Sequence, residues 1–333
     1  MKAMVLREPG PVEQNPLALS EEPVPELGPE DVLIKVSVCG VCHTDLHTAE
    51  GELALPKMPV IPGHQIVGTV AKAGSGVTGF RAGDRVGVTW LNSTCRECEY
   101  CRNGLENLCG QARFTGLHAD GGYAGFTAAP ARYVFAMPAG FSDEQAAPLL
   151  CAGAIGFRSL RLCGIRKGQR LGLYGFGASA HIALQVARYR DCDVYVFTRS
   201  EEHQKHALEL GAVWAGSAQD EPPAKMHGSI TFAPAGWIVK EALRALDKGG
   251  ALAINAVHLS PIPEMPYDLI YHERTVRSVA NLTRRDAEEF LKVAAEVPVK
   301  TDVETYPLEE ANEVLQRLKK SEIRGAAVLK INF

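Results

Sequence analysis

The stretch LGLYGFGASA, residues 171–180, places a short apolar run directly before a glycine loop. The loop has the pattern G-x-G-x-x-A, and residues 178–189 after it have helical spacing of their apolar side chains. A strand, a glycine loop and a helix in this order bind a pyrophosphate, because free amides and the helix dipole favour the anion. We therefore predict a dinucleotide site that contains Gly175, Gly177 and Ala178.

Strands and helices alternate on both sides of this loop from about Lys167 onward. The expected strands are 171–174, 194–198, 213–215, 229–233, 251–256 and 276–280, with a helix ending at 210–211. Such alternation is typical of right-handed crossovers, so we predict an α/β fold with a doubly wound parallel (Rossmann) sheet. The end of the chain is expected to form helices 285–296 and 309–320 and a strand at 326–331.

The first half of the chain has a different pattern. Residues 32–38 alternate, and further short strands are expected at 66–70 and 85–89. The segments between them are rich in glycine and proline and carry most of the cysteines. This half indicates an irregular, mostly β domain, and 333 residues are enough for two domains.

The composition excludes several classes of protein. The net charge is −4 without a run of like charges, so neither nucleic acid nor a membrane surface is expected as a partner. No apolar leader or membrane span is evident, and we expect a cytoplasmic protein. Nine cysteines in such a chain favour metal-binding or catalytic thiols over a disulfide framework.

Four of the cysteines lie close together in the pattern C-x2-C-x2-C-x7-C, with polar residues between them. Four thiolates can close every position of one tetrahedral zinc, which makes a structural site. An iron–sulfur cluster or a chance group of reduced thiols are the alternatives. The predicted structural zinc ligands are Cys95, Cys98, Cys101 and Cys109.

A second metal site is indicated by three other segments: CGVCHTDLH at 39–47, GHQ at 63–65 and LLCAG at 149–153. One cysteine of the first segment, His64 and Cys151 would form a Cys₂His set that leaves one zinc position open. Taken singly, the first segment could be a redox C-x-x-C pair, His64 a core histidine and Cys151 a small buried hydrophobe. Spacing alone does not choose between Cys39 and Cys42.

These motifs together resemble the zinc-containing, medium-chain alcohol dehydrogenase family over essentially the whole chain. The resemblance implies that Cys42, His64 and Cys151 bind the catalytic zinc, and that Cys39 packs at the end of its strand. It also implies that the mostly β domain is GroES-like. The domains are then a catalytic zinc-binding domain at 1–153 with a structural zinc lobe at 92–112, a dinucleotide-binding domain at 154–283, and a return to the catalytic domain at 284–333.

The resemblance assigns further roles in the first motif. Thr44 and His47 would carry the alcohol proton from the zinc-bound oxygen to solvent through the cofactor ribose; three residues apart, they share one face if the segment is helical. Asp45 would orient the zinc ligand His64. Without catalysis, Thr44 and His47 would be a helix cap and a surface imidazole.

Three further positions follow from the same resemblance. Trp90 would line the substrate pocket, which favours primary alcohols, although it could be a core residue. Arg324 would reach the cofactor pyrophosphate or be one more surface arginine. The family usually has glutamate after the zinc-binding histidine, whereas this chain has Gln65. A neutral amide lends the zinc no negative charge, so rates and ligand exchange are expected to differ.

The activity implied is reversible hydride transfer between a primary alcohol and NAD(P)⁺, on a chain with two zinc ions that forms homodimers or homotetramers. A polyol or other secondary-alcohol dehydrogenase of the same family is the alternative. From another class, the chain could be a non-catalytic zinc- and nucleotide-binding protein. Zinc-free quinone reductases of the superfamily lack this ligand set.

The end of the second strand predicts that NADP(H) is preferred and NAD(H) possible. NAD-binding folds place Asp or Glu about 20 residues after the glycine loop. Here the strand ends in Thr198, Arg199 and Ser200, and the first carboxylate is Glu201. Arg199 can offer a fork of donors to a 2′-phosphate, with the two hydroxyls beside it. In the alternative, Arg199 points into solvent and Glu201 bonds the ribose.

Overall fold

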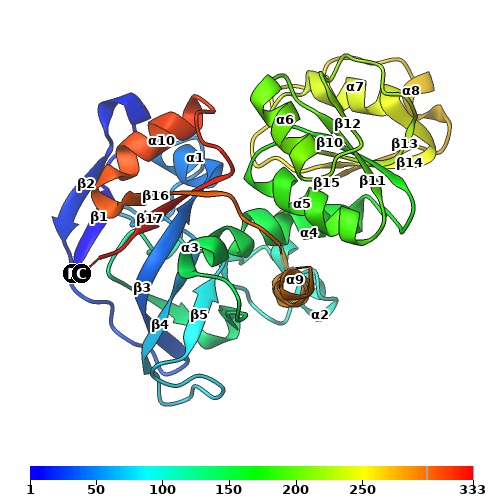
Figure 1. Ribbon diagram of the computed structural model, residues 1–333. Coiled ribbons are helices and arrows are strands. Elements are labelled where there is room, and N and C mark those ends of the chain that lie inside the picture. The colour runs from blue at the N-terminus through cyan, green and yellow to red at the C-terminus, as the bar shows by residue number, and fades with distance from the viewer. Residues whose placement is uncertain (298, 333) are drawn as a thin grey trace. The chain divides into compact units, whose positions relative to one another are not determined.

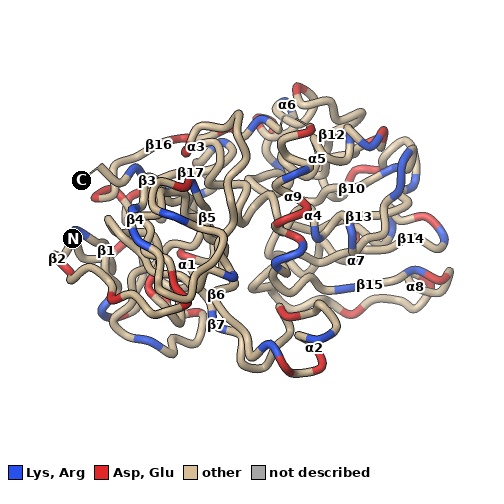
Figure 2. Tube along the Cα trace, turned by 90° about the horizontal axis from the view of Figure 1, so that it is seen from below, with Lys and Arg blue, Asp and Glu red and all other residues tan. Residues whose placement is uncertain are grey.

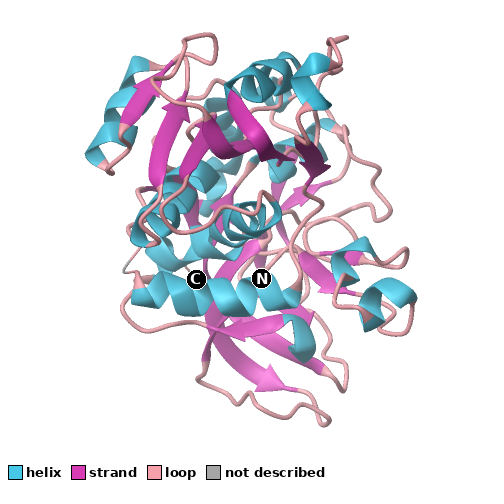
Figure 3. Cartoon of the chain, turned by 90° about the vertical axis from the view of Figure 1, so that its right-hand side faces the viewer, coloured by secondary structure: helices cyan, strands magenta, loops and turns pink. Residues whose placement is uncertain are grey.

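The computed structural model describes residues 1–297 and 299–332. The chain divides into two compact units, each built around its own sheet (Figures 1 and 3). The first unit consists of Met1–Cys151, Asn281–Ala295 and Lys300–Phe333, and the second of Ala152–Ala280 and Glu296–Val299.

The second unit contains a six-stranded sheet in which every neighbouring pair of strands is parallel. The order β12-β11-β10-β13-β14-β15 puts the first strand, β10, near the middle, so the chain winds outward in both directions. This confirms the predicted doubly wound sheet. The strands are β10 (Arg170–Tyr174), β11 (Asp193–Phe197), β12 (Trp214–Gly216), β13 (Met226–Thr231), β14 (Leu246–Ile254) and β15 (Thr275–Ser278). The helices are α4 (Ala152–Leu162), α5 (Ala178–Tyr189), α6 (Glu201–Glu209), α7 (Trp237–Ala245) and α8 (Asp268–Tyr271).

The central strands of this sheet are buried on both faces. In β10, Leu171, Leu173 and Tyr174 have no exposed surface, and the Tyr174 ring stacks on Phe197 of β11 at 4.2 Å between centroids. A run of apolar residues in place of an alternating pattern is typical of such strands. Helix α5 packs on β10 and β11, and α7 packs on β13 and β14. The glycine loop is thereby held between two buried elements.

Two strand boundaries differ from the apolar runs that predicted them. Strand β13 begins at Met226, and β14 begins at Leu246, directly after α7. The first part of β14 is the polar and glycine-rich segment 247–250, whose sequence favours a turn. The two strands pair there with a register shift between Met226 and Gly228. Backbone pairing therefore extends beyond the buried apolar residues.

The first unit contains a seven-stranded sheet of order β16-β17-β3-β4-β5-β9, with β8 also paired to β3. Two small two-stranded sheets, β1-β2 and β6-β7, accompany it. The large sheet consists of β3 (Asp31–Val41), β4 (Gln65–Ala73), β5 (Arg85–Val88), β8 (Phe126–Pro130), β9 (Val134–Ala136), β16 (Val303–Pro307) and β17 (Ala326–Lys330). The small strands are β1 (Lys2–Leu6), β2 (Leu17–Glu21), β6 (Leu91–Ser93) and β7 (Arg113–Phe114), and the helices are α1 (His43–Glu50), α2 (Glu99–Arg102), α3 (Asp143–Ala146), α9 (Arg284–Glu296) and α10 (Ala311–Lys319).

Strand β3 is the element that positions the site in this unit. Its alternating side chains Val32, Ile34, Val36 and Val38 are all buried, as the sequence predicts. It pairs with β4 along one edge, and along its other edge with β8 and with β17 from the end of the chain. β3 then leads through Cys42 directly into α1. The start of α1 is therefore anchored to the centre of the sheet.

Charged residues of both signs are interspersed along both units (Figure 2). Among the helices that the structure describes, none is long and apolar enough to cross a membrane.

Candidate active site and metal centres

The site in the first unit begins with the cap of α1. Cys42 is the N-cap residue, and its Sγ accepts a hydrogen bond from the amide of Thr44 at 3.3 Å. The Asp45 carboxylate reaches back and accepts from the amide of Cys42, Oδ2 to N, at 2.9 Å. These reciprocal bonds form a capping box, with cysteine in the place usually taken by serine or threonine. The cap fixes the direction of the Cys42 thiol.

The other carboxylate oxygen of Asp45 holds the second segment. Oδ1 accepts from the amide of Gly63 and from Nδ1 of His64, both at 3.1 Å. Gly63 has φ of +95°, and a Cβ there would lie 2.4 Å from the buried Tyr123 ring, so glycine is required. With Nδ1 bound to Asp45, His64 is left with Nε2 for other partners, and this atom lies 3.3 Å from the sulfur of Cys42.

Three side chains converge at this point. The sulfur atoms of Cys42 and Cys151 and a ring nitrogen of His64 all lie within 4.8 Å of one another. His64 is buried, and the two cysteines are half-buried. Two thiols and an imidazole are ligands that zinc prefers, and three of them leave a tetrahedral ion one open position. Cys39 lies outside this group: it is fully buried in β3, and its thiol donates to the carbonyl of Gly40.

The three side chains of this group change one another's pKa values. A hydrogen bond from the Cys151 thiol, together with nearby His64, lowers the pKa of Cys42 well below its ordinary value in spite of burial. The same hydrogen bond and burial raise the pKa of Cys151. Burial acts against a charged His64, but Asp45 and Cys42 raise its pKa. Zinc binds thiolates and neutral imidazole, so metal binding here must release protons.

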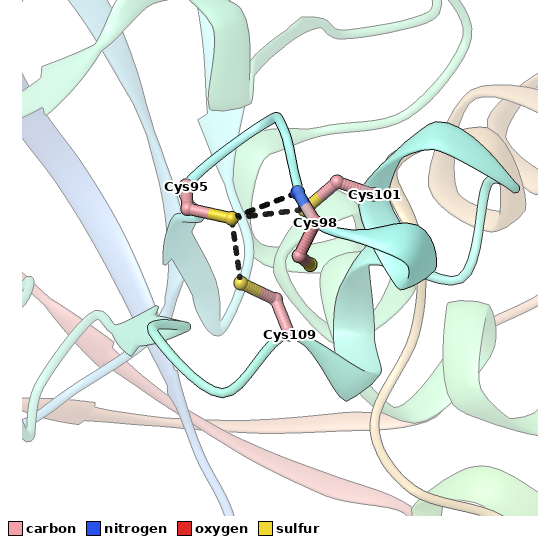
Figure 4. Close-up of side chains that lie close together, drawn as sticks. All are labelled: Cys95, Cys98, Cys101 and Cys109. Carbon is pink, nitrogen blue, oxygen red and sulfur yellow. Dashed lines mark hydrogen bonds between the residues drawn. The ribbon is translucent and has the colours of Figure 1, made fainter.

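The four remaining predicted zinc ligands form a separate cluster (Figure 4). The sulfur of Cys95 lies 3.5 Å from that of Cys109 and 3.9 Å from that of Cys101, and all four sulfurs lie within 4.8 Å. Four sulfurs around one tetrahedral zinc are about 3.8 Å apart, given Zn–S bonds of about 2.3 Å. The donor set and its spacing therefore fit zinc. All nine cysteines are free thiols.

Amide donors prepare one of these sulfurs for ionisation. The amides of Glu97 and Cys98 lower the pKa of Cys95 to about 6, because they donate hydrogen bonds to its sulfur. The amide of Cys101 acts to lower the pKa of Cys98. Burial and the neighbouring sulfurs outweigh it and raise the pKa of Cys98 to about 11. The surroundings thus lower the pKa of one thiol of the cluster and raise that of another.

An ion pair that the sequence did not indicate anchors this lobe. The Glu106 carboxylate, between Cys101 and Cys109, accepts from the amide and side chain of Arg284 at 2.9 and 3.2 Å. The Arg284 guanidinium also lies over the ring of Tyr133, whose hydroxyl is 2.8 Å from Thr94. The partners are far apart in sequence, so no local pattern could predict them.

The predicted relay residues lie on α1. Thr44 is buried, and the His47 side chain is 14% exposed. The Nδ1 atom of His47 contacts the carboxylate of Glu52, which follows the helix. Glu52 was not among the predicted site residues.

Trp90 lies next to His64, one of the predicted zinc ligands. Its ring centroid is 6.1 Å from that of His64, and its ring stacks on Phe114 of β7 at 4.3 Å. Trp90 is half-buried, so it is not a plain core residue. Phe114 extends the aromatic surface beside His64, but no sequence motif marks it as a site residue.

In the second unit, the glycine loop has the predicted structure. Gly175 has φ of +89°, and a Cβ there would lie 3.1 Å from the amide nitrogen of Ala233. Gly177 is the N-cap of α5, and Ala178 is its first residue. Ala180, in the last position of the motif, is fully buried. Only glycine allows this turn between strand and helix.

The end of β11 presents the residues expected to select the cofactor. Thr198 is buried and Arg199 is exposed. The Ser200 hydroxyl caps α6 by accepting from the amide of His203 at 3.3 Å, a bond that leaves its own proton available to an acceptor. Glu201 is the exposed first residue of α6. Arg324, in the first unit, is exposed, and its amide donates to Glu304 at 2.7 Å.

Two family models match the chain. Residues 28–139 match the alcohol dehydrogenase GroES-like domain, and residues 180–296 match the zinc-binding dehydrogenase domain. Fold and site together define a zinc-binding dehydrogenase with a GroES-like and a nucleotide-binding domain.

Individual proteins are similar over almost the whole chain. A Mycobacterium tuberculosis protein named "Probable alcohol dehydrogenase AdhA" is 48% identical and covers 99% of this chain and 97% of its own. The structure of a Sorghum bicolor cinnamyl alcohol dehydrogenase superposes with a TM-score of 0.91 at 29% identity, covering 99% and 97%. A zinc-binding dehydrogenase of Sinorhizobium meliloti 1021, solved bound to NADP, has a TM-score of 0.87 at 25% identity, covering 99% of both chains.

The chain therefore belongs to the zinc-containing, medium-chain alcohol dehydrogenase family. This confirms the resemblance and the two-part fold that its motifs predict.

The contacts of Asp45 generate a first test. Asp45→Ala removes the acceptor that holds Nδ1 of His64 and the cap of α1, so we expect zinc affinity at the Cys42 site to fall about 10- to 100-fold. Zinc loss to a competing chelator measures this. Asp84→Ala, which removes a carboxylate on a surface turn, should leave affinity unchanged. Equal affinities in the Asp45 variant and the wild type would contradict the assigned role.

Proposed function

We propose that this alcohol dehydrogenase catalyses reversible hydride transfer between a primary alcohol and NADP⁺, and that it holds two zinc ions. The observation that carries the proposal is the convergence of Cys42, His64 and Cys151, with Asp45 orienting the histidine. These three residues would hold the catalytic zinc. The structural zinc would be held by Cys95, Cys98, Cys101 and Cys109.

When bound, the catalytic zinc supplies a Lewis acid that makes an alcohol hydroxyl more acidic and a carbonyl more electrophilic. The protein's own residues then move the proton. Thr44, buried beside the zinc ligands on α1, relays it toward His47. His47 is partly exposed and can pass the proton to water. The glycine loop holds the dinucleotide through its amides, and Arg324 is proposed to contact the pyrophosphate.

The aromatic pair near His64 supports a preference for primary alcohols and their aldehydes. Trp90 is stacked on Phe114, which restricts the movement of its ring. A large, fixed ring beside the zinc ligands leaves less room for a second substituent on the reacting carbon. A secondary alcohol or polyol is therefore the second candidate. A zinc- and nucleotide-binding protein without catalysis is the remaining alternative.

We also propose that the chain forms a homodimer or homotetramer. Strand β15 is the last in its sheet, and all four of its residues are exposed. Tyr267 and Tyr271, in the segment before it, are 69% and 62% exposed. An open strand edge beside exposed aromatic rings is a surface that a second copy can cover.

Activity and zinc content test the proposal together. The purified chain should reduce a simple primary aldehyde with NADPH, should contain two zinc ions by elemental analysis, and should lose activity on chelation. Cys42→Ala should lose one zinc and the activity and keep the fold. Cys98→Ala should lose the other zinc and mainly stability, because closed zinc sites contribute folding energy. One zinc or none in the wild type would contradict the two-site proposal.

The cofactor preference has its own test. A carboxylate at the end of the second strand repels a 2′-phosphate, whereas the exposed Arg199 can bind it. We expect kcat/KM to favour NADPH over NADH in the wild type, and Arg199→Asp to reverse this preference. Lys248→Asp, with the same charge change on an exposed residue of the same unit, is the control. A wild type that already favours NADH would exclude the proposed role of Arg199.

A further inference from the structure

Glu52 lies directly after α1 and is bonded by its backbone to His47. The helix ends at Glu50, and the next residue, Gly51, has the left-handed conformation with φ of +76°. The amide of Gly51 donates to the carbonyl of Thr48 at 3.2 Å, and the amide of Glu52 donates to the carbonyl of His47 at 2.9 Å. This pair of bonds is a Schellman motif, which fixes the chain direction after the helix.

The Schellman turn also brings the Glu52 side chain over the same histidine. The Glu52 Oε2 atom accepts a hydrogen bond from Nδ1 of His47. Glu52 thus bonds His47 through both its backbone and its side chain. A Cβ at residue 51 would lie 2.9 Å from the side chain of Pro9, so another residue would have to displace Pro9 as well as adopt a positive φ. Glycine at 51 therefore places the carboxylate.

Two other ionisable side chains on α1, Glu50 and His43, have different contacts from Glu52. Glu50 Oε1 lies 2.7 Å from Nζ of Lys319 on α10 and accepts from the amide of Val12. His43, one turn earlier, is tilted by 41° to the His47 ring at 6.4 Å between centroids. Glu52 is the carboxylate in direct contact with His47 Nδ1.

This contact decides which nitrogen of His47 can accept a proton. An ionised carboxylate only accepts hydrogen bonds, so Nδ1 must carry the hydrogen. In the neutral ring, Nε2 then carries the lone pair that can accept a proton. A proton arriving from the alcohol through Thr44 binds to Nε2, the ring becomes an imidazolium ion held by Glu52, and the same Nε2 releases a proton to water.

We propose that Glu52 is a positioning residue for proton transfer, which holds His47 in the Nδ1–H tautomer and in one orientation. The proposal rests on the role of His47 in the proposed function. Without Glu52 the ring samples both tautomers, so a smaller fraction of molecules can accept the proton at Nε2.

The experiment compares Glu52→Ala and Glu52→Gln in the wild-type and His47→Ala backgrounds. In the wild-type background we expect Glu52→Ala to lower kcat about tenfold, less than the roughly 10²- to 10⁴-fold that an acid–base group contributes directly, without changing KM for the cofactor or the zinc content. Glu52→Gln keeps an oxygen acceptor and should retain at least half of kcat. In the His47→Ala background, Glu52→Ala should have no further effect, because both changes act through one group. Glu8→Ala, an exposed carboxylate in the segment next to Gly51, is the matched control.

Nitrogen-15 NMR of the histidine side chains provides a readout that a merely structural role would not move. We expect His47 to be in the Nδ1–H form in the wild type and in a mixture of tautomers in Glu52→Ala. Equal losses of kcat from Glu52→Ala in both backgrounds, or an unchanged tautomer, would overturn the proposal. If His47→Ala alone leaves kcat unchanged, the role of His47 in the proposed proton relay is rejected. If His47→Ala lowers kcat and Glu52→Ala does not, only the role of Glu52 is rejected.

Discussion

The carboxylate of Asp45 joins the two segments on which the catalytic site depends. One of its oxygens caps α1 at Cys42, and the other holds Gly63 and His64. Asp45 itself is buried, which raises its pKa, while His64 acts in the opposite direction. A buried carboxylate is stable only when its oxygens are bonded, and here each oxygen has a partner. The Asp45 side chain thus caps α1, helps to fix the position of the Cys42 thiol and orients the His64 imidazole.

Local chemistry explains why much of the site could be predicted from the sequence. The helix predicted at 178–189 coincides with α5, because strand, glycine turn and helix are adjacent in the chain. The four-cysteine lobe is equally local. Cys42 and Cys39 have similar spacing, and only the family resemblance distinguished them. The structure supplies the physical reason: Cys42 caps a helix beside His64, whereas Cys39 is buried in β3 opposite Leu329 of β17.

The remaining features arise from contacts that no local pattern contains. Glu106 and Arg284 are 178 residues apart in sequence, and Phe114 meets Trp90 only because β6 pairs with β7. The missed strand ends in β13 and β14 arise from backbone pairing through residues with little apolar content. Gln65, which departs from the family, is buried at the start of β4 opposite Gly40. Its amide is neutral, so Cys42, Cys151 and Asp45 are the groups that can carry negative charge at the proposed zinc site.

We infer that this chain builds two chemically different zinc sites from separate sets of ligands. X-ray absorption at the zinc edge measures the ligands directly in the purified protein. The account predicts a mixed environment, with sulfur at about 2.3 Å and lighter nitrogen or oxygen atoms at about 2.0–2.1 Å. In Cys42→Ala only the all-sulfur environment should remain. A wild type with an all-sulfur spectrum, or a spectrum that Cys42→Ala leaves unchanged, would contradict the account.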